Sequence, residues 1–127
     1  MDSRTVRDAY RESTLETAPP IKVVRLLYEG ALRFLDQAAA ADPKDPHSRF
    51  VDGLTRADLI VTELRLSLEH QQAPQVAAGL EQLYLFTENR IQAALQQRDT
   101  APIAEARDVL ARLFDAWSQV AIDGSAG

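Results

Sequence analysis

The chain has 127 residues, of which 46% are hydrophobic and 26% charged, so it is long and apolar enough to form one globular domain with its own core. Its 19 acidic residues outnumber its 14 basic ones, and the net charge of -5 argues against a nucleic-acid binder that relies on a broad basic surface. The absence of cysteine excludes disulfides, zinc–thiolate sites, thiol nucleophiles and iron–sulfur clusters.

Residues 1 to 16 form a polar segment whose only sizeable apolar side chains are Val6, Tyr10 and Leu15. Such a segment cannot support a core of its own. It is either a frayed terminus or a loosely docked segment, in which Val6 and Tyr10 lie four residues apart and cover an apolar groove as one helical face. No stretch has the apolar run of a signal peptide or of a membrane span of about 20 residues, so we expect a soluble, cytoplasmic protein without membrane insertion.

The stretch from residue 17 to 41 predicts an amphipathic helix with an unusually wide apolar face. Pro19 and Pro20 open it, and Pro20 suits the first helical position. The polar residues cover only about 120° of the helical wheel, and they are Lys22, Arg25, Glu29, Arg33 and Asp36. Packing against one neighbouring helix needs an apolar stripe only somewhat wider than about 100°. The apolar face of this helix is wider than that, so we predict a central helix that also presents Leu26 and Tyr28 to a partner.

The second predicted helix follows a proline- and aspartate-rich connection, residues 42 to 48, in which we interpret His47 as a solvated loop residue. Its core positions are spaced 4, 3, 4, 3 and 4 residues apart, which is typical of a bundle helix, and they are Phe50, Leu54, Ala57, Val61, Leu64 and Leu68. Leu59 and Leu66 lie about 180° from that seam. They are either ordinary exposed leucines or one edge of a binding groove.

The third and fourth helices follow two further polar connections. The third is predicted over about residues 75 to 97, and its core face holds Val76, Leu80, Leu83, Tyr84, Ile91, Ala94 and Leu95. Leu85 and Phe86 fall off this face and add exposed apolar surface. The fourth begins near residues 99 to 102, which offer cap candidates and an early proline, and its seam is Ile103, Ala106, Leu110, Leu113, Trp117 and Val120.

These four long helices predict an all-α fold, an antiparallel four-helix bundle in an up-and-down arrangement. Three short polar connections join the helices, and no segment has the alternating β-branched pattern of a strand. We expect one bundle domain over residues 17 to 122. It is flanked by the flexible or loosely docked N-terminal segment, residues 1 to 16, and by a flexible tail, residues 123 to 127.

The sequence gives little support to catalysis. His47 and His70 lie in or beside connections, no Glu-x-x-His pair of a di-iron site is present, and the five glycines are too scattered for a phosphate-binding loop. An enzyme would need Arg33 or Arg56 to converge with Arg90 on an anionic substrate inside the bundle, whereas surface ion pairing is the simpler interpretation. We therefore assign no catalytic residue, cofactor or metal ligand, and the surplus apolar surface indicates a module that binds an apolar segment of another polypeptide.

The first predicted helix, with the sequence TAPPIKVVRLLYEGALRFLDQA, resembles the signature of the flagellin-specific export chaperones, the FliS family. That signature reads approximately T-A-S-P-x-K-L-x-x-x-L-Y-D-G-A-I-R-F-L. It is matched by Thr17, Ala18, Pro20, Lys22, Leu27, Tyr28, Gly30, Ala31, Arg33, Phe34 and Leu35, and the resemblance continues at Leu83, Tyr84, Asn89, Arg90, Leu113, Ala116 and Trp117. The chain departs from the signature at Pro19 and Ile21, where the family has a capping Ser and a Glu. The loss of such a cap costs about 1 kcal/mol.

The resemblance implies a cytoplasmic chaperone that binds the disordered C-terminal region of flagellin, blocks premature polymerisation and delivers flagellin to the flagellar export apparatus without a cofactor. It also implies that the N-terminal segment covers part of the client surface, with Tyr10 at the family's recurrent tyrosine. We predict a monomer that binds one client through Val6, Tyr10, Leu26, Tyr28, Leu59, Leu66, Leu85 and Phe86. The alternative is a structural bundle whose apolar stripes build a homodimer.

Overall fold

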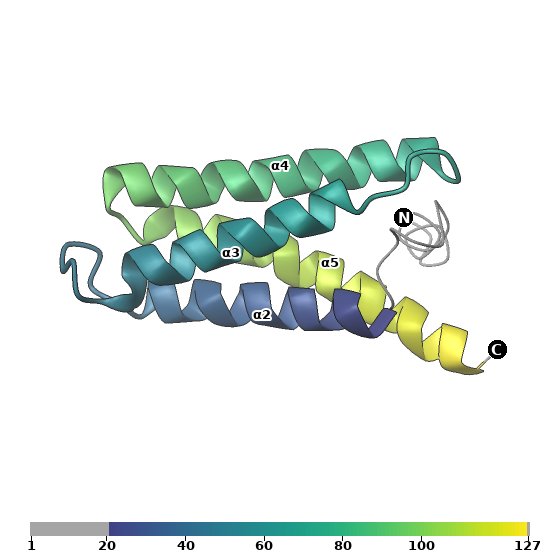
Figure 1. Cartoon of the computed structure of the whole chain (residues 1–127), viewed down its shortest axis with the longest axis horizontal. Helices are drawn as coiled ribbons and strands as arrows, with labels where there is room; N and C mark the ends of the chain where they lie inside the picture. Colours follow the sequence, from purple (N-terminus) through teal and green to yellow (C-terminus); the bar gives the residue numbers. More distant parts are fainter. Residues whose placement is uncertain (1–20, 127) are drawn as a thin grey trace.

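The computed structural model describes residues 21 to 126, with side chains as far as residue 119. It contains four helices, α2 (Ile21–Ala39), α3 (Arg49–Leu66), α4 (Pro74–Gln97) and α5 (Ala101–Ala126). Consecutive helices run in opposite directions, and the described part of the chain contains no strand (Figure 1). Because α2 and α4 each pack against both α3 and α5, the helices form a closed ring in chain order. The predicted antiparallel four-helix bundle is confirmed.

The helix ends follow from local capping. Ser48 is the N-cap of α3, and its Oγ accepts a hydrogen bond from the backbone N–H of Phe50 at 3.3 Å. Pro74 opens α4 at the first helical position, and Arg98 ends that helix in the left-handed conformation with a φ of 51°. Among the predicted cap candidates of α5, Asp99 makes the bond, since its Oδ1 accepts from the N–H of Ala101 at 3.0 Å.

The predicted seams account for most of the core. All six seam residues of the second helix are buried, and so are those of the fourth as far as Trp117. In α4, Val76, Leu83 and Leu95 are only partly buried, while Thr87 is fully buried and donates its hydroxyl to the backbone oxygen of Leu83 at 2.9 Å. That bond satisfies the Thr87 hydroxyl, which is why a polar residue is tolerated there.

Gly53 marks the closest approach of α3 to α2. A Cβ placed on it would lie 2.9 Å from the backbone oxygen of Phe34 and 3.3 Å from the Cβ of Ala38. Only a residue without a side chain fits between these helices without displacing one of them. Nothing in the sequence alone marks this contact.

The C-terminal end of the bundle differs from the prediction. Residues 123 to 126 were expected to leave the helix as a flexible tail, whereas α5 continues to Ala126 and extends past the beginning of α2 (Figure 1). No proline stops α5, and a single glycine such as Gly124 costs a helix only about 1 kcal/mol. A glycine and a serine near the end of a chain are therefore weak evidence for a helix end.

Candidate binding surface

Five apolar side chains predicted to contact a partner lie on the surface of α2, α3 and α4. Their exposed fractions are 63% for Leu26, 65% for Leu59, 68% for Leu66, 40% for Leu85 and 41% for Phe86. Isolated exposed leucines are ordinary on a protein surface. We call these five residues the apolar band. The register between the helices shows how far apart they lie along the bundle.

The register between α2 and α3 places Leu26 beside the end of α3. Gly30 lies against Ile60, since a Cβ on Gly30 would be 3.4 Å from the Ile60 Cδ1. The two helices are antiparallel, so Leu26, one turn before Gly30, is level with Leu64, one turn after Ile60. Leu66 follows two residues later on the outer face of α3, close to the level of Leu26.

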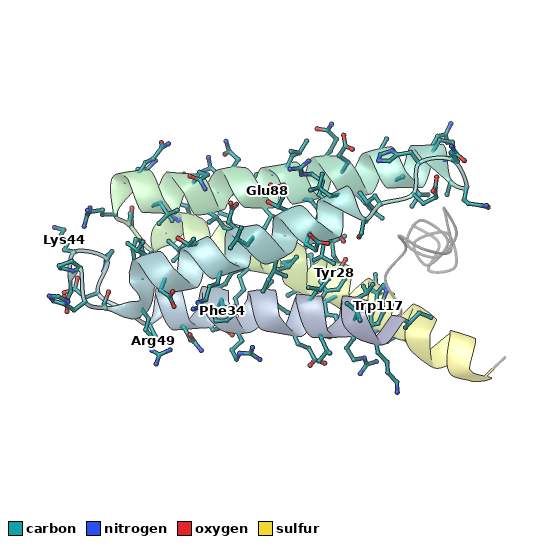
Figure 2. The ribbon with its side chains drawn as sticks, in the orientation of Figure 1. Tyr28, Phe34, Lys44, Arg49, Glu88 and Trp117 are labelled. Carbon is teal, nitrogen blue, oxygen red and sulfur yellow. The ribbon has the colours of Figure 1, made fainter. Side chains whose placement is uncertain are left out.

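The register between α3 and α4 places Leu66 level with Leu85. The carboxylate of Glu88 accepts hydrogen bonds from Arg65 Nε at 2.7 Å and from Thr62 Oγ1 at 2.8 Å, and Figure 2 shows Glu88 on the side of α4 that faces α3. Leu66 on α3 therefore lies within about one turn of Leu85 on α4. The apolar band thus takes its residues from three successive helices, with Leu26, Leu66 and Leu85 at similar levels along the bundle.

A polar network joins α3 to α4 beside this part of the apolar band. Arg65 forms an ion pair with Glu88 that also raises the pKa of the guanidinium, chiefly through the hydrogen bond. The pKa of Asp58 is raised by partial burial and by the nearby Glu88 carboxylate, against the opposing effects of Arg65 and of a hydrogen bond from Gln92. These polar groups hold α3 against α4 beside Leu66, which is itself exposed.

Tyr28 is not part of this surface. Its side chain is fully buried, its hydroxyl shares a hydrogen bond with that of Tyr84 across the core, and its ring stacks on Phe114 with centroids 5.4 Å apart. Burial raises the pKa of both tyrosines well above the usual value. Tyr28 was predicted to face a partner, but in this closed bundle it does not reach the surface and instead joins α2 to α4 across the core.

The arginines do not converge inside the bundle. The guanidinium groups of Arg33 and Arg56 lie on the surface near the Phe34 ring, 5.3 and 5.8 Å from its centroid. Arg90 points to the other side of the molecule, where its Nη1 lies 3.7 Å from Glu105 Oε1 on α5. An enzyme that binds an anion inside the bundle would need Arg33 or Arg56 to converge with Arg90 there, and these residues do not converge.

The histidines are at the ends of helices or in loops. His47 is exposed in the connection between α2 and α3, as predicted, and His70 Nε2 lies 3.3 Å from Glu81 Oε2. Among the residues that the structure describes, no three His, Cys, Asp or Glu side chains form a group able to hold a metal ion. Nor is any helix of that described part long and apolar enough to span a membrane.

Two predicted partner residues, Val6 and Tyr10, lie outside the described residues, and their role stays a prediction. Val23 was not among the predicted partner residues, yet it is 40% exposed on α2 one turn before Leu26 and extends the apolar surface toward the helix start. An apolar residue in a helix with so wide an apolar face carries no signal of its own exposure.

Fold and surface together define a class of protein, a four-helix bundle with surplus apolar surface. Comparison with known sequences gives the family. The sequence model of the family described as flagellar protein FliS matches residues 3 to 124. The chain belongs to the FliS family, as its first predicted helix indicated.

Several similar proteins are named flagellar secretion chaperone FliS. The protein of Bacillus subtilis (strain 168) is 30% identical over 111 residues, which cover 87% of this chain and 82% of the relative. That of Vibrio cholerae (serotype O1) is 29% identical over 109 residues, 86% of this chain and 80% of the relative. The Campylobacter jejuni protein is 28% identical over 120 residues, 94% of each chain.

Proposed function

We propose that this protein is a flagellar export chaperone whose client is the C-terminal region of flagellin. The names of its relatives support an export chaperone, which needs a surface that holds an apolar polypeptide segment. In this proposal the protein binds the disordered client region in the cytoplasm, prevents premature polymerisation and delivers flagellin to the flagellar export apparatus. A monomer binds one client, and no cofactor or covalent step takes part.

The observation that carries the proposal is the apolar band across α2, α3 and α4. Its five side chains are 40 to 68% exposed, so a client that covers them removes about half of each side chain from water. Full burial of a large apolar side chain contributes roughly 1.5–3 kcal/mol, and the band therefore offers a gross stabilisation of roughly 4–8 kcal/mol. This is enough to select an apolar client segment.

The chemistry of the band also limits how tightly the client is held. A disordered segment loses conformational freedom when it becomes ordered on the surface, and this cost offsets part of the gross stabilisation. Because the band crosses three helices, one client segment must wrap around the bundle or fold across it to reach all five residues. Coupled folding and binding of this kind gives moderate affinity over a large surface, which suits a client that must be released at export.

The test is a calorimetric titration of the full chain with a peptide of the flagellin C-terminal region. We expect Leu26→Gln and Leu66→Gln each to weaken binding by about 5- to 30-fold, because each variant forfeits the burial of a half-exposed leucine. The matched control is Val51→Gln. Val51 is an apolar residue of α3 with 47% exposure, but it lies at the opposite end of that helix, outside the band.

Equal losses for Val51→Gln and the two band variants would show that the band is not the client site. A protein that ignores the peptide altogether would contradict the proposed client. In that case the structural homodimer without a flagellin client is the remaining interpretation, and its oligomeric state in the same sample would test it.

A further inference from the structure

Two arginines from different helices share one aromatic ring on the surface. The guanidinium carbons of Arg33 on α2 and Arg56 on α3 lie 5.3 and 5.8 Å from the centroid of the half-buried Phe34 ring. Both distances are within the range of a cation–π contact. A cationic site therefore forms where α2 meets α3, and we call Arg33 and Arg56 the arginine pair.

Gly30 allows Arg33 to lie along the contact between the two helices. A Cβ on Gly30 would be 3.4 Å from Ile60 Cδ1 of α3 and 3.9 Å from Arg33 Nη2. The guanidinium of Arg33 therefore folds back over the preceding turn of α2, on the side where α3 packs. An arginine that extended straight into water would not lie close to both Gly30 and Phe34.

The arginine pair has unused hydrogen-bond donors. Arg56 Nε donates to both carboxylate oxygens of Asp52, at 3.0 and 3.1 Å, and this ion pair is exposed. The guanidinium of Arg33 forms no ion pair or hydrogen bond with any residue in the described part of the chain. A guanidinium has five N–H donors and can bind a carboxylate through two of them at once. The donors of Arg33 and the Nη groups of Arg56 are thus available to a carboxylate from another polypeptide.

The arginine pair lies at one end of the apolar band. Arg33 follows Leu26 by seven residues, or about two turns, and so lies on the same side of α2. On α3, Arg56 precedes Leu59 by three residues, and Leu66 is level with Leu26. The surface along α2 and α3 is therefore apolar first and becomes cationic about 10 Å further on.

Charge on α3 favours a carboxylate at the arginine pair over one beside the leucines. Glu63 is exposed between Leu59 and Leu66 and has no ion-pair partner among the residues that the structure describes. It repels a carboxylate placed beside those leucines, whereas the arginine pair attracts one. The net charge of -5 also makes an acidic group of a partner unfavourable over much of the remaining surface.

From these observations we propose that the arginine pair binds the carboxylate of an Asp or Glu side chain of the client, and that this contact sets the direction in which the client lies along α2 and α3. The inference rests on the proposed function, since the client is the polypeptide that covers the apolar band. Arg33 and Arg56 both lie more than one turn from the ends of their helices. The client therefore passes over them, which suits a side chain and not a chain end.

The distance between the two parts of the surface predicts a spacing in the client. The carboxylate should be separated from the client residue that covers Leu26 by about seven residues if the client is helical there. The separation should be about three residues if the client is extended. An ion pair at one end of an apolar contact fixes the register of a partner, because the reversed orientation leaves the carboxylate without its arginines.

Calorimetric titration of the full chain with a peptide of the flagellin C-terminal region, at low and high salt, tests the contact. Arg33→Gln should weaken binding by about 3- to 10-fold at about 50 mM NaCl and by less than about twofold at about 500 mM, because salt screens an exposed ion pair. Leu26→Gln should weaken binding about equally at both salt concentrations, since it removes apolar burial and no charge.

Two matched controls remove a positive charge elsewhere. Arg112→Gln removes an arginine whose exposed ion pair with Asp108 on α5 has the same spacing as that of Arg56 with Asp52. Lys22→Gln removes an exposed cation of α2 at the other end of the band, beside Leu26. Both variants should keep the affinity within about twofold of that of the natural chain at either salt concentration.

Replacing each Asp and Glu of the peptide in turn by Asn or Gln identifies the client's side of the contact. One replacement should weaken binding to the natural chain by about the same factor as Arg33→Gln and have no further effect on the Arg33→Gln variant, as expected for two groups that interact directly. A peptide whose C-terminal carboxylate alone is converted to an amide should bind normally.

The outcomes separate this inference from the proposed function. If the peptide binds and Leu26→Gln weakens it, but Arg33→Gln behaves like Arg112→Gln, the arginine pair is not a client contact and the proposed function stands. A larger loss for Lys22→Gln or for the amidated peptide would also overturn the inference, because the carboxylate would then lie at the other end of the band or at the chain end. A peptide that does not bind the natural chain would contradict the proposed function, and this inference with it.

Discussion

Gly53 and Gly79 both lie inside helices, and the structure predicts that replacement by alanine changes the stability of the fold in opposite directions at the two positions. In Gly53→Ala, the new methyl group would lie 2.9 Å from the backbone oxygen of Phe34, and a backbone atom cannot swing aside as a flexible side chain can. In Gly79→Ala, the methyl group would meet nothing within 4 Å. The pair therefore separates helix propensity, which both variants gain, from overpacking, which only one suffers.

The magnitudes follow from these two contributions. Replacing a glycine by alanine inside a helix stabilises it by roughly 0.5–1 kcal/mol, so Gly79→Ala should be more stable than the natural chain by up to about 1 kcal/mol. Overpacking of a tight helix contact costs roughly 1–3 kcal/mol, so Gly53→Ala should lose up to about 2.5 kcal/mol after the same gain is included. The two variants should thus differ by the overpacking cost alone, about 1–3 kcal/mol.

Urea unfolding followed by circular dichroism at 222 nm measures this difference, with unfolding slopes checked for equality so that the midpoints are comparable. A thermal melt gives the same order as a shift of several degrees. If Gly53→Ala proved as stable as Gly79→Ala, then α2 and α3 would not approach as closely as the structure shows at Phe34.

Further expected outcomes concern the core, the polar seam and the N-terminal segment. Leu64→Ala and Leu113→Ala should each lower the free energy of unfolding by roughly 2–5 kcal/mol, since both residues are buried; unchanged melting would contradict the core assignment. Folding raises the pKa of Asp58, so its ionised form costs stability above that pKa. Asp58→Asn should therefore raise the melting temperature at pH 7, and the gain should vanish in melts below about pH 4. Deletion of residues 1 to 16 should tighten client binding by no more than roughly a hundredfold if the segment covers the band; calorimetry that finds weaker binding would instead indicate direct client contact.

The core of α3 and the fold itself could be predicted because their signals are periodic. Core residues spaced three and four apart specify which side of a helix is buried, and this sufficed for the seam that runs from Phe50 to Leu64. The exposure of Leu59 and Leu66 follows from the same periodicity, since both lie opposite the seam. Periodicity also identified Leu85 and Phe86 as residues off the core face of α4.

The remaining features depend on contacts between helices, which one sequence does not reveal. Tyr28 was assigned to the partner surface because a tyrosine in a wide apolar face suits both a core and an interface, and only the position of Tyr84 on the opposite helix decides between them. Likewise Gly53 carries no mark of its close contact with Phe34. The register that brings Leu26 level with Leu66 is also a property of packing and not of either helix alone.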